Sequence, residues 1–515
     1  MTKPISFGEI NVDVRAGRDR AAHALDPETP FRIAILGDFS GRASRGVCET
    51  GPALASRPAV VIDRDNFDEV LSKLNVQLRL SVAGDHGPRL DLSFRELDDF
   101  HPDRIFERTD VFRKLKETRA KLADPQTFAA AVRSSQAVRE HRPADPASTS
   151  APVELFRSSL LDQVTGATEG RAAGATPSRT RDEWGEFLKQ IVEPHLVPNP
   201  DPRQPEILAQ VDQATGGLMR SLMHYPDFQA LEAAWRAVFF LVRRVETGAQ
   251  LKLYLLDVSK TELAADLASA DDLSQTGIYK LLVEKTVGTP GAEPWAVLVG
   301  SYTWVPARND AELLGRLARI ASAAGAPFLS AASSRLLGCA SFAETPNPRD
   351  WSGRTDAEGA KSWELLRKLP EASYVGLVLP RFLLRLPYGE KTGATERFDF
   401  EEMSPTPEHE EYLWGNPAIA CALLLAQAFT EDGWNLRPGG SAEIEGLPLH
   451  IYKVEGTSRA TPCAEALFTE EAVEAILEKG FMPLVSQKDR DAIRLARSQS
   501  LAEPLTPLSG RWRIS

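Results

Sequence analysis

The chain has 515 residues, of which 43% are hydrophobic and 26% are charged, and it contains four cysteines. This composition is typical of globular proteins, and the length suggests about two to four domains. Four cysteines are too few for a disulfide-stapled scaffold, so we expect a reducing compartment. The net charge of −12 argues against nucleic acid or an anionic membrane surface as a partner, because both need overall positive charge.

Neither a secretory signal nor a membrane span is predicted. The first 30 residues carry charges throughout, which leaves no apolar stretch for a signal peptide. The longest nearly uncharged apolar run, Ala418–Phe429, is too short to cross about 30 Å of hydrocarbon. We therefore expect a cytoplasmic protein without direct membrane insertion, in which this run forms a buried helix.

The N-terminal part predicts a small mixed α/β module over residues 1–122. A β-branched apolar run at Phe31–Leu36 predicts a buried strand that ends in the turn Gly37–Gly41. Residues with alternating polarity predict antiparallel strands, and apolar residues at helical spacing predict helices. Further strands are expected at 60–62, 76–80 and 90–94, and helices within 63–74 and at 106–122.

A linker is predicted over residues 123–180. Between His141 and Thr180, 24 of the 40 residues are Ala, Pro, Ser, Thr or Gly, which is too little apolar content to offset the entropy of ordering. Inside it, residues 154–164 predict a short amphipathic helix. This helix either docks on its own domain or acts as a tethered recognition peptide. Its apolar residues are Leu155, Phe156, Leu160, Leu161 and Val164.

A larger α/β module is predicted over residues 181–515. Apolar residues at helical spacing predict helices near 184–192 and 228–242. The alternating segment 251–258 predicts a strand, and Ser259–Glu262 has the capping-box pattern that opens a helix. The fold class is therefore mixed α/β. Further strands are expected at 296–299, 328–331 and 374–379, and helices near 310–321, 363–366 and 418–429.

Local motifs predict no catalytic, metal or cofactor site. The turn Gly37–Gly41 lacks the glycine patterns of nucleotide loops, so we interpret Asp38 and Ser40 as bonding the turn's own N–H groups. The cysteines are isolated, and His409 lacks a second histidine one turn away. Neither a nucleophile elbow nor a calcium-loop spacing occurs. An enzyme whose site is assembled from distant residues remains an alternative.

Several motifs together resemble the contractile sheath proteins of the bacterial type VI secretion system. Residues 30–42 (PFRIAILGDFSGR), 60–71 (VVIDRDNFDEVL) and 94–103 (FRELDDFHPD) resemble the small, TssB-type subunit. Five later segments resemble the large, TssC-type subunit: 223–242, 256–263, 291–302, 373–389 and 412–420. The chain therefore looks like a fusion of both subunits, whose modules would intertwine into one core.

The resemblance implies a non-enzymatic sheath protomer that stacks around an inner tube and drives it outward on contraction. Implied partners are further copies of the chain, the inner-tube hexamer protein, baseplate proteins, separate sheath subunits and an AAA+ unfoldase. In the family the unfoldase recognises a helix near the start of the large subunit, which here corresponds to 154–164. The motif residues that the resemblance marks for assembly are Gly37, Asp38, Phe39, Phe67, Phe228, Leu231, Trp235, Pro380, Arg381, Arg385, Trp414 and Asn416.

One departure from the family concerns the end of the chain. The segment resembling Glu478–Ser500 is followed in the family by a region that supplies strands to neighbouring protomers, whereas this sequence stops at Ser515. Residues 501–515 contain two prolines and little strand pattern, so we expect that region to be missing. Two functions stay open: a protomer that polymerises through other contacts, or a sheath-like accessory or adaptor at a sheath end or baseplate that does not propagate a polymer.

Overall fold

The computed structural model describes residues 5–10, 28–81, 89–123, 204–353, 356–438 and 443–512. The chain divides into two compact units, and each takes residues from both sides of the predicted linker. Unit 1 comprises Met1–Leu74, Ala230–Leu386 and Glu408–Ser515. Unit 2 comprises Asn75–Gln229 and Pro387–Pro407.

Unit 1 is built on a nine-stranded sheet with the order β11-β15-β14-β8-β7-β6-β1-β5-β2. The strands from β14 to β5 are parallel, and the pairs β2–β5, β14–β15 and β11–β15 are antiparallel. The interior strand β1 pairs with β5 on one side and with β6 on the other. The strand bounds are β1 Phe31–Gly37, β2 Val60–Ile62, β5 Leu251–Asp257, β6 Val297–Trp304, β7 Phe328–Ala332, β8 Val375–Leu379, β11 Glu443–Ile444, β14 Met482–Ser486 and β15 Ile493–Leu495.

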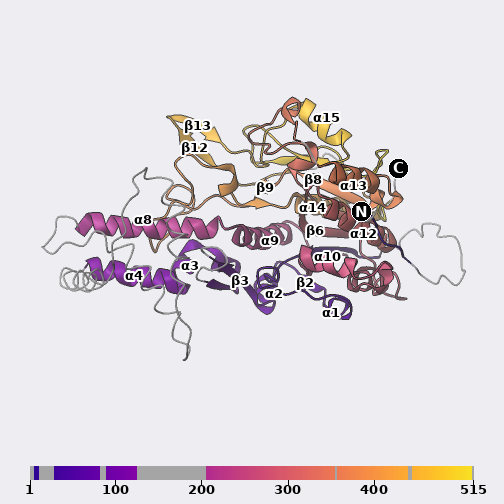
Figure 1. The fold of residues 1–515 in the computed structure, drawn as a ribbon, viewed down its shortest axis with the longest axis horizontal. Helices are drawn as coiled ribbons and strands as arrows, with labels where there is room; N and C mark the ends of the chain where they lie inside the picture. Colours follow the sequence, from indigo (N-terminus) through magenta and orange to yellow (C-terminus); the bar gives the residue numbers. More distant parts are fainter. Residues whose placement is uncertain are drawn as a thin grey trace, which may run out of the picture. The chain divides into compact units, whose positions relative to one another are not determined.

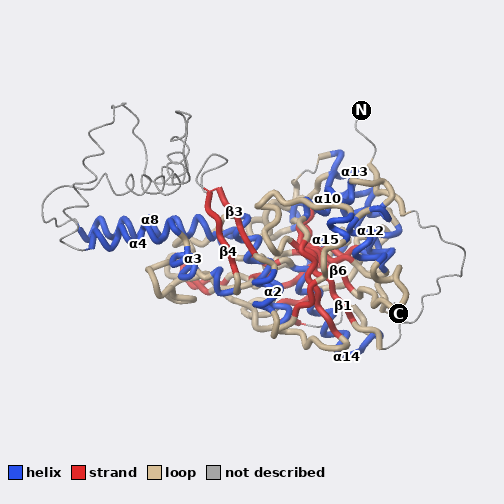
Figure 2. The backbone as a smooth tube through the Cα atoms, turned by 90° about the horizontal axis from the view of Figure 1, so that it is seen from below, coloured by secondary structure: helices blue, strands red, loops and turns tan. Residues whose placement is uncertain are grey.

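Helices cover both faces of this sheet, as expected for buried parallel strands. Figure 2 shows α12 (Arg308–Ala324) and α13 (Ala357–Arg367) on one side of the strands and α14 (Pro417–Asp432) on the other. All residues of β7 and β8 are buried. The other helices of unit 1 are α1 Pro52–Ala55, α2 Phe67–Lys73, α10 Lys260–Ala268, α11 Gly277–Tyr279 and α15 Glu470–Glu478.

Shorter elements complete unit 1. The pair β9 (Phe382–Leu383) and β10 (Trp414–Gly415) and the hairpin β12 (Ile451–Val454) and β13 (Thr457–Ala460) form separate two-stranded sheets. The chain also makes single turns of 3-10 or π helix. These are η3 Leu273–Gln275, η4 Lys280–Glu284, η5 Ser334–Leu337, η6 Pro348–Asp350, η7 Pro370–Tyr374, η8 His409–Glu411 and η9 Gly433–Asn435.

Unit 2 combines one antiparallel strand pair with helices. Its elements are β3 Val76–Ser81, β4 Arg89–Phe94, η1 Leu97–Phe100, α3 Pro102–Arg108, α4 Asp110–Ala123 and α8 Gln204–Met223, and α9 (Pro226–Val242) begins here and continues into unit 1. Helices α4 and α8 lie side by side in Figures 1 and 2. An ion pair of 2.5 Å between Arg119 Nε and Asp212 Oδ1 joins them.

Most sequence-predicted elements are confirmed, and one helix is corrected. The expected helix at 106–122 is divided, because Thr109 has an extended backbone (φ −95°, ψ 129°) that ends α3 before α4 begins. The helix expected within 63–74 is confirmed as α2, which starts at Phe67 after a turn in which the Asp63 carboxylate accepts hydrogen bonds from the Asp65 and Asn66 N–H groups. The predicted helices at 154–164 and 184–192 lie outside the described residues.

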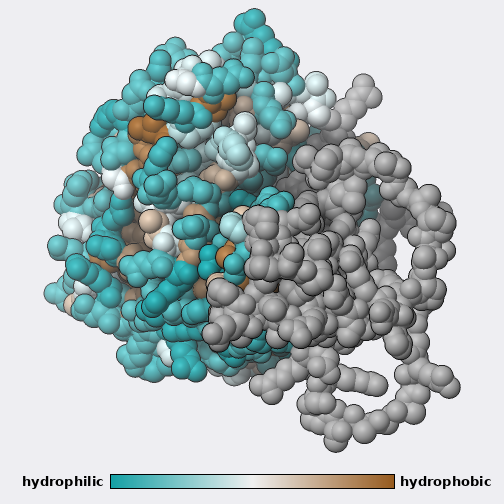
Figure 3. Space-filling model, turned by 90° about the vertical axis from the view of Figure 1, so that its left-hand side faces the viewer, coloured by the Kyte–Doolittle hydropathy of each residue, from teal (hydrophilic) through white to brown (hydrophobic). Residues whose placement is uncertain are grey.

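The described residues were compared with the requirements of a membrane-spanning helix, and one face of their surface is shown in Figure 3. None of the helices in the described ranges is long and apolar enough to cross a bilayer. Figure 3 shows a mainly hydrophilic described surface on which hydrophobic residues form small separate patches.

Candidate functional site: the seam between β1 and β5

The candidate site lies where β1 and β5 end at the same edge of the sheet. The two strands run in register from Phe31 opposite Leu251 to Gly37 opposite Asp257. The Gly37 carbonyl accepts a hydrogen bond of 2.8 Å from the Val258 N–H. A Cβ on Gly37 would lie only 3.0 Å from the Phe39 ring, so glycine leaves room for this ring to pack against the end of β1. We call the polar residues at this edge the seam.

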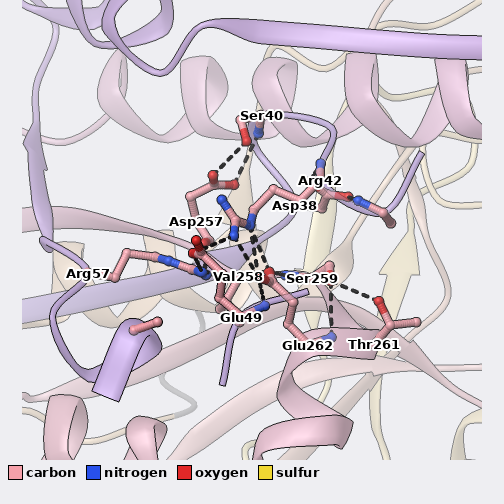
Figure 4. Close-up of polar contacts among 12 residues, drawn as sticks. Asp38, Ser40, Arg42, Glu49, Arg57, Asp257, Val258, Ser259, Thr261 and Glu262 are labelled. Atoms are coloured by element: carbon pink, nitrogen blue, oxygen red, sulfur yellow. Dashed lines mark hydrogen bonds and ion pairs between the residues drawn. The ribbon is translucent and has the colours of Figure 1, made fainter. Parts of the chain in front are cut away.

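The turn after β1 bonds partly to itself and partly to β5. As predicted, the Asp38 carboxylate accepts hydrogen bonds from turn N–H groups, those of Arg42 (2.6 Å) and Ala43 (2.8 Å). The prediction for Ser40 is wrong, because its hydroxyl donates to Asp257 Oδ2 at 2.7 Å (Figure 4). Asp257 Oδ1 also accepts from the Phe39 and Ser40 N–H groups.

A buried carboxylate on α10 forms the centre of the seam. The Glu262 side chain is 0% exposed and accepts hydrogen bonds from Arg42 Nη2 at 2.8 Å and Arg57 Nη2 at 3.0 Å. Glu49, which is half exposed, bonds the same two guanidinium groups (Figure 4). Both arginines precede the predicted linker in the chain, whereas Glu262 follows it, and all three lie in unit 1. The predicted capping box is also confirmed, because Ser259 and Glu262 bond each other's backbone N–H groups.

The pKa values of the seam carboxylates depend on burial and on the neighbouring groups. Burial alone would raise the pKa of Glu262, but the hydrogen bonds from Arg42 and Arg57 outweigh burial and lower that pKa to about 2. Burial raises the pKa of Asp257, and the nearby Asp38 charge adds to this effect against the hydrogen bonds from Ser40. Separating these two segments of unit 1 would leave buried charges without partners, which is costly.

A second buried carboxylate on α10 holds the loop before α1. Asp266 accepts hydrogen bonds from the N–H groups of Gly51 (2.6 Å), Gly277 (3.0 Å) and Ile278 (2.9 Å). A Cβ on Gly277 would collide with the Gly51 carbonyl, so this close approach of two segments distant in sequence requires glycine.

An aromatic cluster extends the seam behind the turn. Trp235 on α9 is 0% exposed and donates from Nε1 to the Phe39 carbonyl at 2.8 Å. Its ring meets Phe39 and Phe67 edge-on, with centroid distances of 5.7 and 5.6 Å. Leu231 is buried one turn earlier on the same helix. The structure thus brings together these four motif residues.

Arg385 belongs to a separate buried ion cluster in unit 1. Glu232 is 0% exposed, and it accepts hydrogen bonds from Arg385 Nε at 2.8 Å and Arg236 Nε at 2.6 Å. Burial opposes ionisation of Glu232, but the charges of Arg385 and Arg236 lower its pKa.

Arg381 and Trp414 belong to another cluster. The Arg381 N–H and Nε donate to Glu465 at 3.0 and 2.6 Å, and His409 Nε2 lies 3.0 Å from the same carboxylate. The Arg381 guanidinium carbon is 5.9 Å from the centroid of Trp414. Pro380, which precedes Arg381, is buried.

The two remaining motif residues, Asn416 and Phe228, make their contacts away from the seam. Asn416 caps α14 by accepting from the Ala418 N–H at 3.0 Å, and its amide donates to the Tyr302 carbonyl at 3.0 Å. In unit 2, Phe228 packs against Phe94 and Phe100 with centroid distances of 6.1 and 5.9 Å.

Sequence reasoning missed the charged partners that close these clusters. The missed residues are Arg42, Arg57, Asp257, Glu262, Glu232 and Glu465. Asp257 directly follows the core of a predicted strand, as Asp38 does, and the ends of parallel strands share one edge. That signal could have placed the two aspartates near each other. The partners of Glu262 lie more than 200 residues earlier, so no local pattern identifies them.

The seam is bonded internally rather than open to a ligand. Its carboxylates accept hydrogen bonds from arginine side chains, the Ser40 hydroxyl and backbone N–H groups of the same unit. Among the described residues, no group of three or more His, Cys, Asp or Glu side chains is placed to hold a metal ion. The arrangement is therefore that of an internal interface, in which two segments distant in sequence are fixed to each other.

Comparisons with known protein families match both modules. Residues 205–502 match the family model VipB, described as EvpB/VC_A0108, tail sheath N-terminal domain. Residues 10–140 match the model T6SS_VipA, described as Type VI secretion system, VipA, VC_A0107 or Hcp2.

Two sheath proteins of Pseudomonas aeruginosa strain PAO1 are similar to the chain. The type VI secretion system sheath protein TssC1 is 36% identical over 356 residues, which cover 68% of this chain and 71% of TssC1. The sheath protein TssB1 is 30% identical over 105 residues, which cover 20% of this chain and 59% of TssB1. The chain therefore belongs to the VipB family of type VI secretion tail sheath proteins and carries a VipA-type (TssB-like) segment ahead of its VipB-type (TssC-like) segment in one polypeptide.

Proposed function

We propose that the chain is a structural, non-enzymatic protomer of a type VI secretion sheath in which both sheath modules are covalently joined. The TssB-like module would span 1–122, the linker 123–180 and the TssC-like module 181–515. The family matches at 10–140 and 205–502 support this division. The observation that carries the proposal is the position of β1 between β5 and β6, with the seam closing one end.

This strand arrangement suits a protomer that must transmit force. Strand β1 has a hydrogen-bonded ladder on both sides, so withdrawing the first module would break both ladders and the buried ion pairs together. Covalent joining also sets a one-to-one ratio and a high effective concentration of the modules. Contraction could then act on the assembled sheath without separating the modules of one protomer.

We assign to the motif residues the role of joining the two modules within one protomer. Phe39, Phe67, Leu231 and Trp235 are buried inside unit 1, and Gly37 and Asp38 shape the turn that they surround. Their positions support a role within the protomer. The residues at contacts between protomers would then lie on other, exposed surfaces.

The proposed partners are further copies of the chain, the inner-tube hexamer protein and baseplate proteins in the cytoplasm, with separate sheath subunits as additional partners. An AAA+ unfoldase would bind Leu155, Phe156, Leu160 and Leu161, which lie outside the described residues. Unchanged unfoldase binding by a Phe156→Ala, Leu160→Ala variant would contradict that last assignment.

Electron microscopy and analytical ultracentrifugation test the sheath proposal. Purified full-length chain is studied over a concentration series, with and without the tube protein. Tubes or rings are expected. A monomer or small oligomer that does not change with concentration or with tube protein would overturn the proposal, and it would support the accessory or adaptor at a sheath end or baseplate instead.

A further inference from the structure

A cavity of about 600 Å³ lies inside unit 1, between helix α14 and the strands β7, β14 and β15. Its volume falls in the range of small-molecule sites, about 300–1,000 Å³, which differ in this from the flat surfaces that join proteins. Its walls come from segments of unit 1 other than those of the seam. The role of the seam in joining two segments therefore does not account for it.

The helical wall of the cavity changes from apolar to acidic along α14. Residues three and four positions apart share one face of a helix, and the lining residues of α14 follow this spacing. They are Cys421, Leu424, Leu425, Ala428, Glu431 and Asp432. The first three are buried, the fourth is half-buried, and the two acids are exposed. The cavity thus runs from an apolar bottom to an acidic mouth.

The opposite wall is apolar at the bottom of the cavity. Leu329 on β7, Met482 on β14 and Leu495 on β15 line it, and all three are buried. Leu508, also buried, contributes from the C-terminal segment. Burial raises the pKa of the Cys421 thiol to about 12, so this side chain is neutral and adds to the apolar lining. An apolar group placed here would be removed from water, which is favourable.

The mouth of the cavity carries an excess of negative charge. Glu431 and Asp432 lie in the last turn of α14, where the helix dipole is negative and no basic residue compensates. Within the described ranges neither carboxylate forms an ion pair or a side-chain hydrogen bond, and neither does the lining residue Arg437. Glu443, a further lining residue, pairs with Arg490 at 3.1 Å. A positive group at the mouth would relieve the repulsion between the two free carboxylates.

We propose that this cavity binds a small amphipathic amine, with its aliphatic body between α14 and the sheet and its ammonium group beside Glu431 and Asp432. The apolar bottom selects the body of the ligand, and the acidic mouth selects its charge. The inference goes beyond the proposed function and does not depend on it.

Three probes with the same eight-carbon chain test the selection for charge: octylammonium, octanoate and octanol. Isothermal titration calorimetry of the full-length chain at neutral pH and low salt measures each affinity. Octylammonium should bind more tightly than octanoate by about tenfold or more, with octanol between them, because only the ammonium gains a charged hydrogen bond at the mouth. Added salt should reduce this preference, since the mouth is exposed.

A double substitution at the mouth tests the two carboxylates. Glu431→Gln with Asp432→Asn should weaken octylammonium binding about tenfold or more and leave octanol binding unchanged. Both side chains are exposed, so circular dichroism should show unchanged folding. Glu474→Gln with Glu478→Gln is the matched control, because it removes two exposed carboxylates from α15, which does not line the cavity.

A bulkier side chain in the wall tests the location of the aliphatic body. Ala428→Phe should weaken the binding of all three probes, because the ring occupies space inside the cavity. Thr430→Phe is its control, since Thr430 is exposed on the same helix and does not line the cavity. Circular dichroism checks both variants, and the mouth variant tests the site independently if Ala428→Phe does not fold.

The proposal is overturned by any of three results. The first is a wild-type chain that does not bind octylammonium, or that binds octanoate equally well. The second is a Glu431→Gln, Asp432→Asn variant that binds octylammonium as its control does. The third is a folded Ala428→Phe variant that binds the probes as Thr430→Phe does. Each result concerns the cavity alone, so the sheath proposal is judged separately by its own assembly experiment.

Discussion

Glu262 shows how one side chain can serve a local and a long-range role. Its carboxylate completes the capping box at the start of α10 and also receives Arg42 and Arg57 from the other module. Ion pairs on the surface contribute little to stability, but a buried charge that loses its partner is strongly destabilising. Glu262 therefore contributes more to the stability of the seam than the exposed Glu49 does.

Replacing Glu262 by Gln should lower the free energy of unfolding by about 3 kcal/mol, because Arg42 and Arg57 would lose their buried counter-charge. Urea denaturation at neutral pH measures the change. Glu49→Gln is the matched control in the same network and should cost only about 0–1 kcal/mol, because its side chain is 48% exposed. Equal losses in the two variants would show that burial does not decide the strength of the seam.

The wild type and the Glu262→Gln variant should also differ in their response to acid. The pKa of Glu262 is about 2 in the folded chain, against an ordinary value of 4.5. The ionised carboxylate therefore stabilises the folded chain fully above pH 4.5, and this stabilisation is lost as pH falls towards 2. The stability gap between wild type and Glu262→Gln should therefore narrow as pH falls through this window. A gap that stayed constant down to pH 2 would contradict the lowered pKa.

Among the helices and strands, the local sequence pattern predicted some elements, whereas others became visible only in the packed structure. Apolar runs correctly predicted β1 and α14, and the spacing of apolar residues correctly predicted β5 and α9. The short strands β9, β10 and β11 were not predicted, because two residues carry no readable period. The break at Thr109 was missed for a related reason, since helical spacing continues across it.

Asn416 offers a test at this scale, because it links the start of α14 to β6. Asn416→Ala should lower the free energy of unfolding by about 1–2 kcal/mol, since both the cap and the bond to the Tyr302 carbonyl are lost. Asn416→Asp keeps the capping oxygen and loses only the donor, so thermal denaturation should place it between the wild type and the alanine variant. An alanine variant as stable as wild type would exclude a role for this cap.

For unit 1 as a whole, the linker should be dispensable once folding is complete. A specific protease site inserted between Gly170 and Arg171 would allow the two modules to be cut apart. Because β1 lies between β5 and β6, both fragments should co-elute in gel filtration under native conditions and separate only in denaturant. Release of the N-terminal fragment in native buffer would show that the shared sheet does not hold the modules together.

The sequence by itself determined the family, the mixed α/β class and the main strands and helices, since motifs and periodicity depend on residues close together in the chain. Only the tertiary structure decided that β1 lies between β5 and β6, which come more than 200 residues later, and that Arg42 and Arg57 meet Glu262. The physical reason is separation: Arg42 and Glu262 are 220 residues apart, and only the strand order brings them to one edge.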